Sequence, residues 1–213
     1  MNNETKIAVV EGKWFKGKNT SVRGLFDLIS DINCGSPHKY HYEMFNNDTA
    51  FQEIIERLAS TDNIHNIYIA AHGSEEGLYG SNGKVITLTK VRNTIKKINE
   101  SHGKLSSIYF GSCNFGNDTN LEDLLLNGNI QLRWVAGYTE SVDFIKSSVL
   151  DALFWNLYIS NNSSTPLKKI KEVCDELLYE VPGLIKELGF KVLAYDGKFD
   201  HPVIDLTENP NLE

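Results

Sequence analysis

Short apolar runs alternate with segments of helical periodicity along most of the chain, and this alternation limits the fold more than any other feature. The expected strands are residues 7–10, 38–45, 64–71, 105–110, 133–137 and 192–195, and the expected helices are residues 22–32, 51–58, 88–98, 121–126, 142–158 and 167–188. Parallel strands need long crossover connections, which are usually helices. The pattern therefore predicts an α/β fold: a three-layer sandwich with a mostly parallel central sheet flanked by helices.

The length of 213 residues fits one sizeable hydrophobic core better than two. No internal repeat or low-complexity linker divides the sequence. We expect a single domain over residues 1–206, followed by a C-terminal tail at 207–213.

Composition and charge narrow the classes of partner. The net charge of -7 disfavours broad attraction to nucleic acid or to an anionic membrane. No apolar run approaches the roughly 20 residues that span a bilayer, and residues 1–6 are too polar to begin a secretory signal. We therefore expect a cytoplasmic protein whose partners are proteins or peptides.

The cysteines and histidines show no spacing typical of a metal site. Cys34, Cys113 and Cys174 are odd in number and widely separated, which favours free thiols over a disulfide framework. Cys174 falls in an apolar helical rhythm and is expected in the core. No metal or other cofactor is expected.

Two reactive side chains stand where apolar runs end. One run leads into His72-Gly73-Ser74, and another leads into Gly111-Ser112-Cys113. Ligands bind at the carboxyl edge of open parallel sheets, so this position suits a functional site. Forty-one residues separate His72 from Cys113, enough for the crossover helix between adjacent parallel strands. The sequence therefore predicts that the imidazole and the thiol lie side by side.

These residue types suit nucleophilic catalysis. A free thiol has a pKa of about 8.5, and a neighbouring imidazolium lowers it, so that the thiolate nucleophile forms near neutral pH. His72 would then protonate the leaving amine. The backbone N–H groups of Gly73 and Cys113 are predicted to form the oxyanion hole for a tetrahedral intermediate.

An apolar strand ending in His-Gly-Ser, followed about forty residues later by one ending in a small residue and Cys, resembles the caspase-like cysteine peptidases. This superfamily (clan CD) includes caspases, metacaspases, legumain, clostripain, gingipains, separase and the bacterial CHAT domains. The segment 134–139 and the following helix with Phe154 and Trp155 resemble CHAT members. The order of elements agrees over residues 5–160, whereas identity is confined to the two motifs. Caspases proper carry Gln-Ala-Cys-Arg-Gly, and residues 111–115 lack its Gln and Arg.

The resemblance implies a cysteine endopeptidase with Cys113 as nucleophile and His72 as acid and base. A role in bacterial defence or cell death, and control by a regulatory protein partner, are hypotheses at the same level. Two alternatives stay open. The chain could be a catalytically silent caspase-like binding or scaffolding module, or a different hydrolase or acyltransferase that uses Cys113.

The resemblance implies that the pocket for the residue before the cut is lined by the loops after the first strand, the nucleophile strand and the next strand, and two of these loops differ in charge. Glu140 and Asp143 follow a strand expected beside that of Cys113 and would favour Arg or Lys before the cut. The loop that follows the first strand, with Lys13, Lys16, Lys18 and Arg23, would instead favour Asp or Glu. We favour the basic substrate, because long lysines in a loop are usually solvated. The competing interpretation is that Glu140 or Asp143 only complements the positive end of the next helix.

Overall fold

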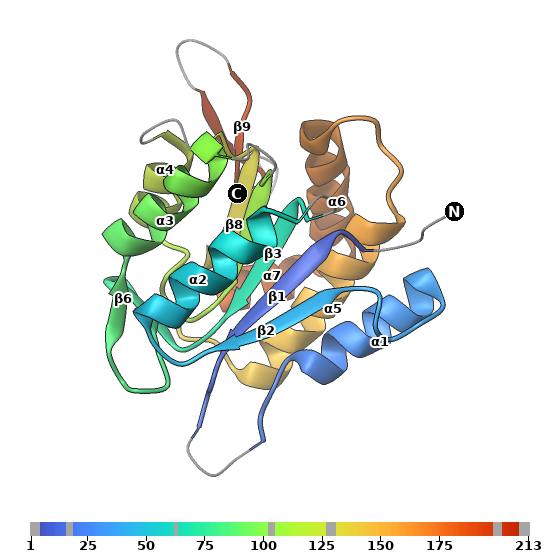
Figure 1. The fold of residues 1–213 in the computed structure, drawn as a ribbon. Coiled ribbons are helices and arrows are strands. Elements are labelled where there is room, and N and C mark those ends of the chain that lie inside the picture. The colour runs from blue at the N-terminus through green and yellow to red at the C-terminus, as the bar shows by residue number, and fades with distance from the viewer. Residues whose placement is uncertain are drawn as a thin grey trace.

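The computed structural model describes residues 5–15, 19–61, 64–101, 105–126, 131–197 and 202–208, and its centre is a large sheet between two layers of helices (Figure 1). The sheet has seven strands in the order β10-β9-β8-β7-β3-β1-β2. Their bounds are β1 Ile7–Gly12, β2 His41–Phe45, β3 Asn66–Ala70, β7 Ser107–Gly111, β8 Trp134–Tyr138, β9 Phe190–Tyr195 and β10 Val203–Asp205. Neighbours from β2 to β8 pair in parallel, whereas β9 and β10 pair antiparallel. The predicted mostly parallel α/β sandwich is confirmed.

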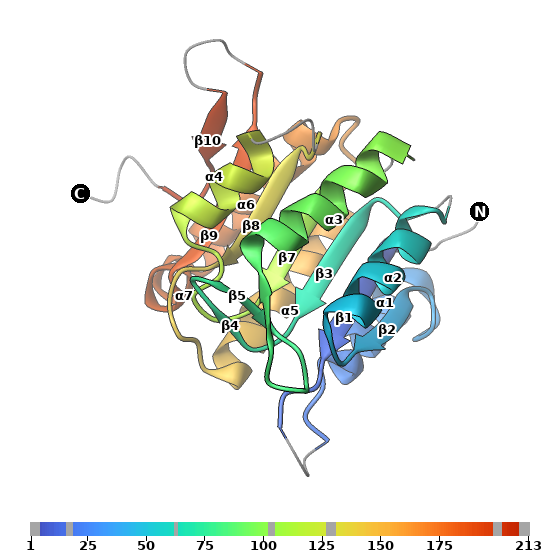
Figure 2. The same ribbon diagram turned by 60° about the vertical axis from the view of Figure 1, so that its left-hand side comes forward.

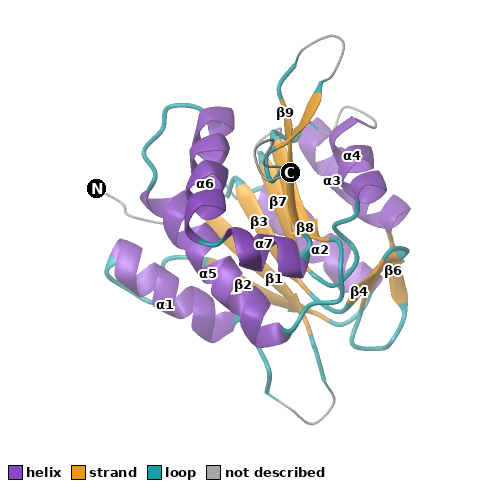
Figure 3. Cartoon of the chain, turned by 180° about the vertical axis from the view of Figure 1, so that it is seen from behind, coloured by secondary structure: helices purple, strands orange, loops and turns teal. Residues whose placement is uncertain are grey.

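Helices cover both faces of the sheet (Figures 1 and 3). One layer holds α2 (Asp48–Ala59), α3 (Leu88–Ser101) and α4 (Asp118–Leu126), and the other holds α1 (Arg23–Cys34), α5 (Phe144–Ser160), α6 (Pro166–Glu180) and α7 (Pro182–Leu188). Each layer packs on its face through a separate apolar cluster, which contains Phe51 and Leu121 on the first face and Phe26 and Trp155 on the second. The strands β3, β7 and β8 are buried along their whole length, which explains their nearly continuous apolar sequences.

The structure corrects three sequence-based expectations. The helix predicted at 167–188 is two helices, α6 and α7, because Pro182 lacks an N–H and forces Val181 out of the helical conformation. A small second sheet, β4 (Gly73–Ser74), β5 (Gly77–Tyr79) and β6 (Val85–Thr87), was not predicted. Neither was β10, so the strand near 192–195 is not the last. Of the expected tail, Thr207 and Glu208 are described and residues 209–213 lie outside the described residues.

No helix in the described part of the chain combines the length and the apolar character that crossing a membrane requires.

Helix α5 carries a carboxylate that is buried in the core. Asp151 is 2% exposed and accepts hydrogen bonds from three tyrosine hydroxyls: Tyr68 at 2.6 Å on Oδ2, and Tyr109 and Tyr138 on Oδ1. Burial raises the pKa of Asp151 to about 6, although the three hydroxyl donors act to lower it.

The raised pKa of Asp151 predicts a pH-dependent contribution to stability. A carboxyl whose pKa is higher in the folded than in the unfolded state stabilises the fold fully below its unfolded value of 3.8, and this contribution is lost as the pH rises through about 6. The free energy of unfolding of the wild type, minus that of Asp151→Asn, should therefore fall by up to about 3 kcal/mol between pH 4 and pH 7. Denaturant titrations at a series of pH values measure this difference. A difference that stays constant or rises with pH would contradict the assignment.

Candidate active site

The pairing of β3 with β7 determines where His72 and Cys113 lie. The two strands run parallel in a register that ends with Ala70 opposite Gly111. His72 and Cys113 each follow two residues later, so both leave the sheet at the same level of its carboxyl edge. Gly73 lies directly against the other loop, since a Cβ atom at this position would be 2.5 Å from the carbonyl oxygen of Cys113. The structure thus brings the two predicted motifs together.

The imidazole of His72 is held by the loop that follows β1. Its Nε2 lies 2.6 Å from the carbonyl oxygen of Trp14, and because a carbonyl can only accept, Nε2 carries the proton. The rings of Trp14 and Phe15 contact the imidazole edge-on, with centroids 5.3 and 5.1 Å away. In the neutral ring this arrangement leaves Nδ1 unprotonated and able to accept a proton.

The thiol of Cys113 is half-buried and faces the loop between β8 and α5. The backbone N–H of Val142 points at Sγ from 3.5 Å, where it can stabilise negative charge on sulfur. The next residue, Asn114, has a φ of 57°, a left-handed conformation that is uncommon outside glycine. Its N–H donates to the carbonyl of Glu140 at 3.1 Å and its Nδ2 donates to Ser141 Oγ at 3.1 Å. The β8–α5 loop therefore fixes the backbone that presents the thiol.

The backbone N–H groups of Gly73 and Cys113 are the two donors predicted for the oxyanion hole. Tyr79 N–H donates to the carbonyl of His72 at 2.8 Å, which makes Gly73 and Leu78 a non-hydrogen-bonded pair of the β4–β5 hairpin. The N–H of Gly73 is therefore turned away from β5. Within the described residues, the N–H of Cys113 has no backbone acceptor. Neither N–H group therefore donates to a backbone carbonyl within the described residues, and their role in an oxyanion hole stays a prediction.

Glu11, which the sequence analysis did not identify, anchors the loop that holds His72. Its side chain is fully buried, and it accepts from Trp14 Nε1 at 2.6 Å, Ser21 Oγ at 2.6 Å and Val22 N at 2.9 Å, as well as from the hydroxyl of Tyr42. A buried carboxylate is tolerated only with such a full set of donors. A glutamate at the end of an otherwise apolar strand was the one available signal.

The predicted substrate-binding carboxylates have distinct environments. Asp143 is the N-cap of α5, where Oδ1 accepts from Ile145 N at 3.0 Å and from Lys146 N at 2.9 Å. This is the local role that the competing interpretation gave it. Glu140 is exposed, and its backbone is tied to Asn114 beside the thiol. Of the opposing cations, Lys13 is described and exposed, and Arg23 pairs with Asp27, whereas Lys16 and Lys18 lie outside the described residues.

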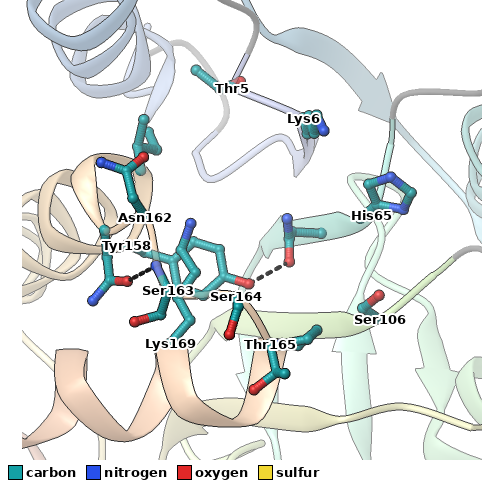
Figure 4. A pocket seen from close by; sticks show the side chains of 14 residues that line it. Thr5, Lys6, His65, Ser106, Tyr158, Asn162, Ser163, Ser164, Thr165 and Lys169 are labelled. Atoms are coloured by element: carbon teal, nitrogen blue, oxygen red, sulfur yellow. Dashed lines mark hydrogen bonds between the residues drawn. The ribbon is translucent and has the colours of Figure 1, made fainter.

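A cavity of about 490 Å³ lies at the opposite, amino edge of the strands (Figure 4). Lys6, His65 and Lys169 line it together with hydroxyl and amide side chains, and it includes no thiol. Burial and the charge of Lys6 lower the pKa of Lys169. This cavity is separate from the edge of the sheet at which His72 and Cys113 lie. Among the residues that the structure describes, no group of three His, Cys, Asp or Glu side chains could hold a metal ion.

Comparisons with known proteins bear on the fold. A family model described as a domain of unknown function (DUF8616) matches residues 40–124, fewer than half of the chain but including both His72 and Cys113. No curated protein matches. Among solved structures, a secreted C11 cysteine protease from Bacteroides thetaiotaomicron, in complex with an irreversible peptide inhibitor, is similar with a TM-score of 0.51 and 8% identity, covering 90% of this chain and 66% of that chain. The likeness supports the caspase-like fold. A specific relation to CHAT domains and a cytoplasmic location stay predictions.

Removing the carboxylate of Glu11 should loosen the loop that holds His72. Glu11→Ala leaves one indole, one amide and two hydroxyl donors without their acceptor, so we expect a loss of about 2–4 kcal/mol in the free energy of unfolding. Glu53→Ala, at an exposed position of α2, is the matched control and should change this free energy by less than about 0.5 kcal/mol. Denaturant unfolding measures both. Equal stability of the two variants would show that Glu11 does not anchor the loop.

Proposed function

We propose that the chain is a cysteine endopeptidase in which Cys113 is the nucleophile and His72 the general acid and base. The observation that supports the proposal is the register of β3 and β7, which ends two residues before His72 and two residues before Cys113, at the carboxyl edge of the sheet. The fit of the imidazole supports it further. With Nε2 held by Trp14, Nδ1 is the nitrogen left to exchange a proton with the thiol and the substrate.

The proposed reaction has two halves. Nδ1 of His72 takes the thiol proton, Sγ of Cys113 bonds to the substrate carbonyl carbon, and the oxyanion receives hydrogen bonds from the N–H groups of Gly73 and Cys113. The C–N bond then breaks as the imidazolium gives its proton to the leaving amine. In the second half, His72 takes a proton from water, the hydroxide attacks the thioester, and the imidazolium returns a proton to sulfur as the acid product leaves.

Within this proposal, Glu140 favours Arg or Lys before the cut. Glu140 is exposed, and its backbone carbonyl accepts a hydrogen bond from Asn114, the residue after Cys113. Its carboxylate is therefore part of the loop that contacts the thiol. Asp143 contributes less to this preference, because one of its oxygens already caps α5. A role in bacterial defence or cell death, and control by a partner protein, remain proposals that rest on the resemblance.

The dyad is tested by single and double variants on a peptide library. Cys113→Ala and His72→Ala should each lower kcat/KM at least about a thousand-fold, and the double variant should be little worse because the pair acts as a unit. His72 is exposed and Cys113 half-buried, so the melting temperature should change little. Substantial turnover by Cys113→Ala would exclude the mechanism.

Thiol labelling supplies the control that separates a protease from a silent module. Burial raises the pKa of Cys34 and, together with Asp175 and Asp205, raises that of Cys174 well above its ordinary value, so both thiols stay protonated at mildly acidic pH. Iodoacetamide at about pH 6 should therefore label Cys113 first, more slowly in His72→Ala and unchanged in Cys34→Ser. Equally slow labelling of Cys113 and Cys34, with no cleavage, would favour the binding module.

The preference before the cut is tested with fluorogenic peptides ending in Arg, Lys, Asp, Asn and Leu. We expect cleavage after Arg and Lys, and a loss of about ten-fold or more in the Arg over Leu ratio of kcat/KM in Glu140→Gln, because a charge-assisted hydrogen bond is lost. Asp143→Asn should lower this ratio less. Glu180→Gln, at an exposed position on α6, is the control. Cleavage after Asp with indifference to Arg would refute the choice, as would an unchanged ratio when both Glu140 and Asp143 are replaced.

A further inference from the structure

A cavity of about 400 Å³ adjoins His72 and is formed by two loops from different parts of the fold. One wall is Lys13 and Trp14, from the loop that follows β1. The other wall begins at Tyr79, the last residue of β5, and continues to Gly83 in the turn before β6. Figure 2 shows that the β5–β6 hairpin and the loop after β1 lie at the same end of the sheet. The volume is in the range of small ligand pockets.

Hydrogen bonds hold both walls in place. The indole of Trp14 donates to buried Glu11 at 2.6 Å. On the other wall, Tyr79 N donates to the carbonyl of His72 at 2.8 Å, and Asn82 N donates to the carbonyl of Asn46 at 3.3 Å. The hairpin is thereby tied at its base to the histidine and at its tip to the loop after β2. The cavity belongs to the folded framework of the site.

The lining residues decide which part of a substrate the cavity can meet. They include His72, but none comes from the loop of Cys113 or from the β8–α5 loop that carries Glu140. His72 is the group that would protonate the leaving amine, so the chain that follows the scissile bond must pass beside it. We propose that this cavity receives the side chain of the residue directly after the cut. The inference rests on the proposed peptidase function.

The chemistry of the lining favours a large aromatic side chain. Trp14 and Tyr79 are aromatic, and Gly83 adds no side chain where a Cβ atom would meet nothing within 4 Å, which leaves room for a large group. Lys13 is exposed at the cavity, and no carboxylate is among the lining residues. A lysine or arginine entering here would meet a like charge without a counter-ion, so a basic residue after the cut is disfavoured. A basic residue is therefore disfavoured after the cut, whereas it is favoured before the cut.

The test uses full-length protein and peptides that are identical except for the residue after the cut, which is Phe, Tyr, Leu, Ala, Glu or Lys. Product formation is followed by mass spectrometry, with Cys113→Ala as the blank. We expect kcat/KM for Phe to exceed that for Ala by roughly ten- to fifty-fold, with Lys the poorest substrate. Tyr79→Ala should reduce the Phe over Ala ratio to a few-fold, whereas Tyr79→Phe should keep it. Lys13→Gln should improve the Lys peptide alone.

The outcomes separate the two proposals. Cleavage that depends on Cys113 but shows no preference for Phe, or a preference untouched by Tyr79→Ala, overturns the cavity assignment and leaves the peptidase standing. Absence of any cleavage that depends on Cys113 overturns the peptidase and the cavity assignment with it. Tyr79→Leu, which keeps the bulk of the side chain without its ring, gives the same comparison if Tyr79→Ala lowers the melting temperature.

Discussion

The parallel pairing of β3 with β7 is the constraint on which the site depends. The two strands are buried along their length, and β1 and β8 pair with their outer edges, so a slip of one residue would turn every side chain to the wrong face. The register is therefore fixed from both sides. Because the ladder ends with Ala70 opposite Gly111, the two strands leave the sheet together, and no long loop is needed for His72 and Cys113 to reach the same edge.

Two buried carboxylates stabilise the two sides of this edge. Glu11 holds the indole of Trp14, and the carbonyl of Trp14 holds Nε2 of His72. Asp151 binds the hydroxyl of Tyr138, and the carbonyl of Tyr138 accepts from Gly116 N, in the loop of Cys113, at 3.0 Å. Each carboxylate has several donors, which makes its burial tolerable. Glu11 is connected to His72 through Trp14 alone, whereas Asp151 is connected to the loop of Cys113 through Tyr138 and Gly116.

The sequence predicted the central sheet and the pair of motifs because these depend on local signals. Fully buried strands have continuous apolar runs, and the residues after them lie at a common edge whatever the helices between them do. The hairpin β4–β6 was missed because strands of two or three residues that include Gly73 and Gly77 are too short to show alternation. The role of Glu11 could not be predicted, since Ser21 and Tyr42, which bind it, are 10 and 31 residues away. Asp143 had two interpretations, as a substrate-binding group and as a complement to the helix end, because sequence alone does not distinguish them. The structure shows the cap, and the substrate role stays a proposal.

The hairpin that the sequence analysis did not predict fixes the backbone of the loop that carries His72. It begins at Gly73, immediately after His72, and Tyr79 N–H satisfies the carbonyl of His72. The same pairing turns the N–H of Gly73 away from β5, so one hydrogen bond fixes the backbone of the histidine and leaves a donor available next to it. A side chain at Gly73 would meet the carbonyl of Cys113 at 2.5 Å, which is too close for any Cβ atom. Glycine is therefore required there for contact between the two loops. A substitution would push the loop of Cys113 away from the loop of His72 and move the wall of the cavity that begins at Tyr79, because both depend on the position of the same peptide unit.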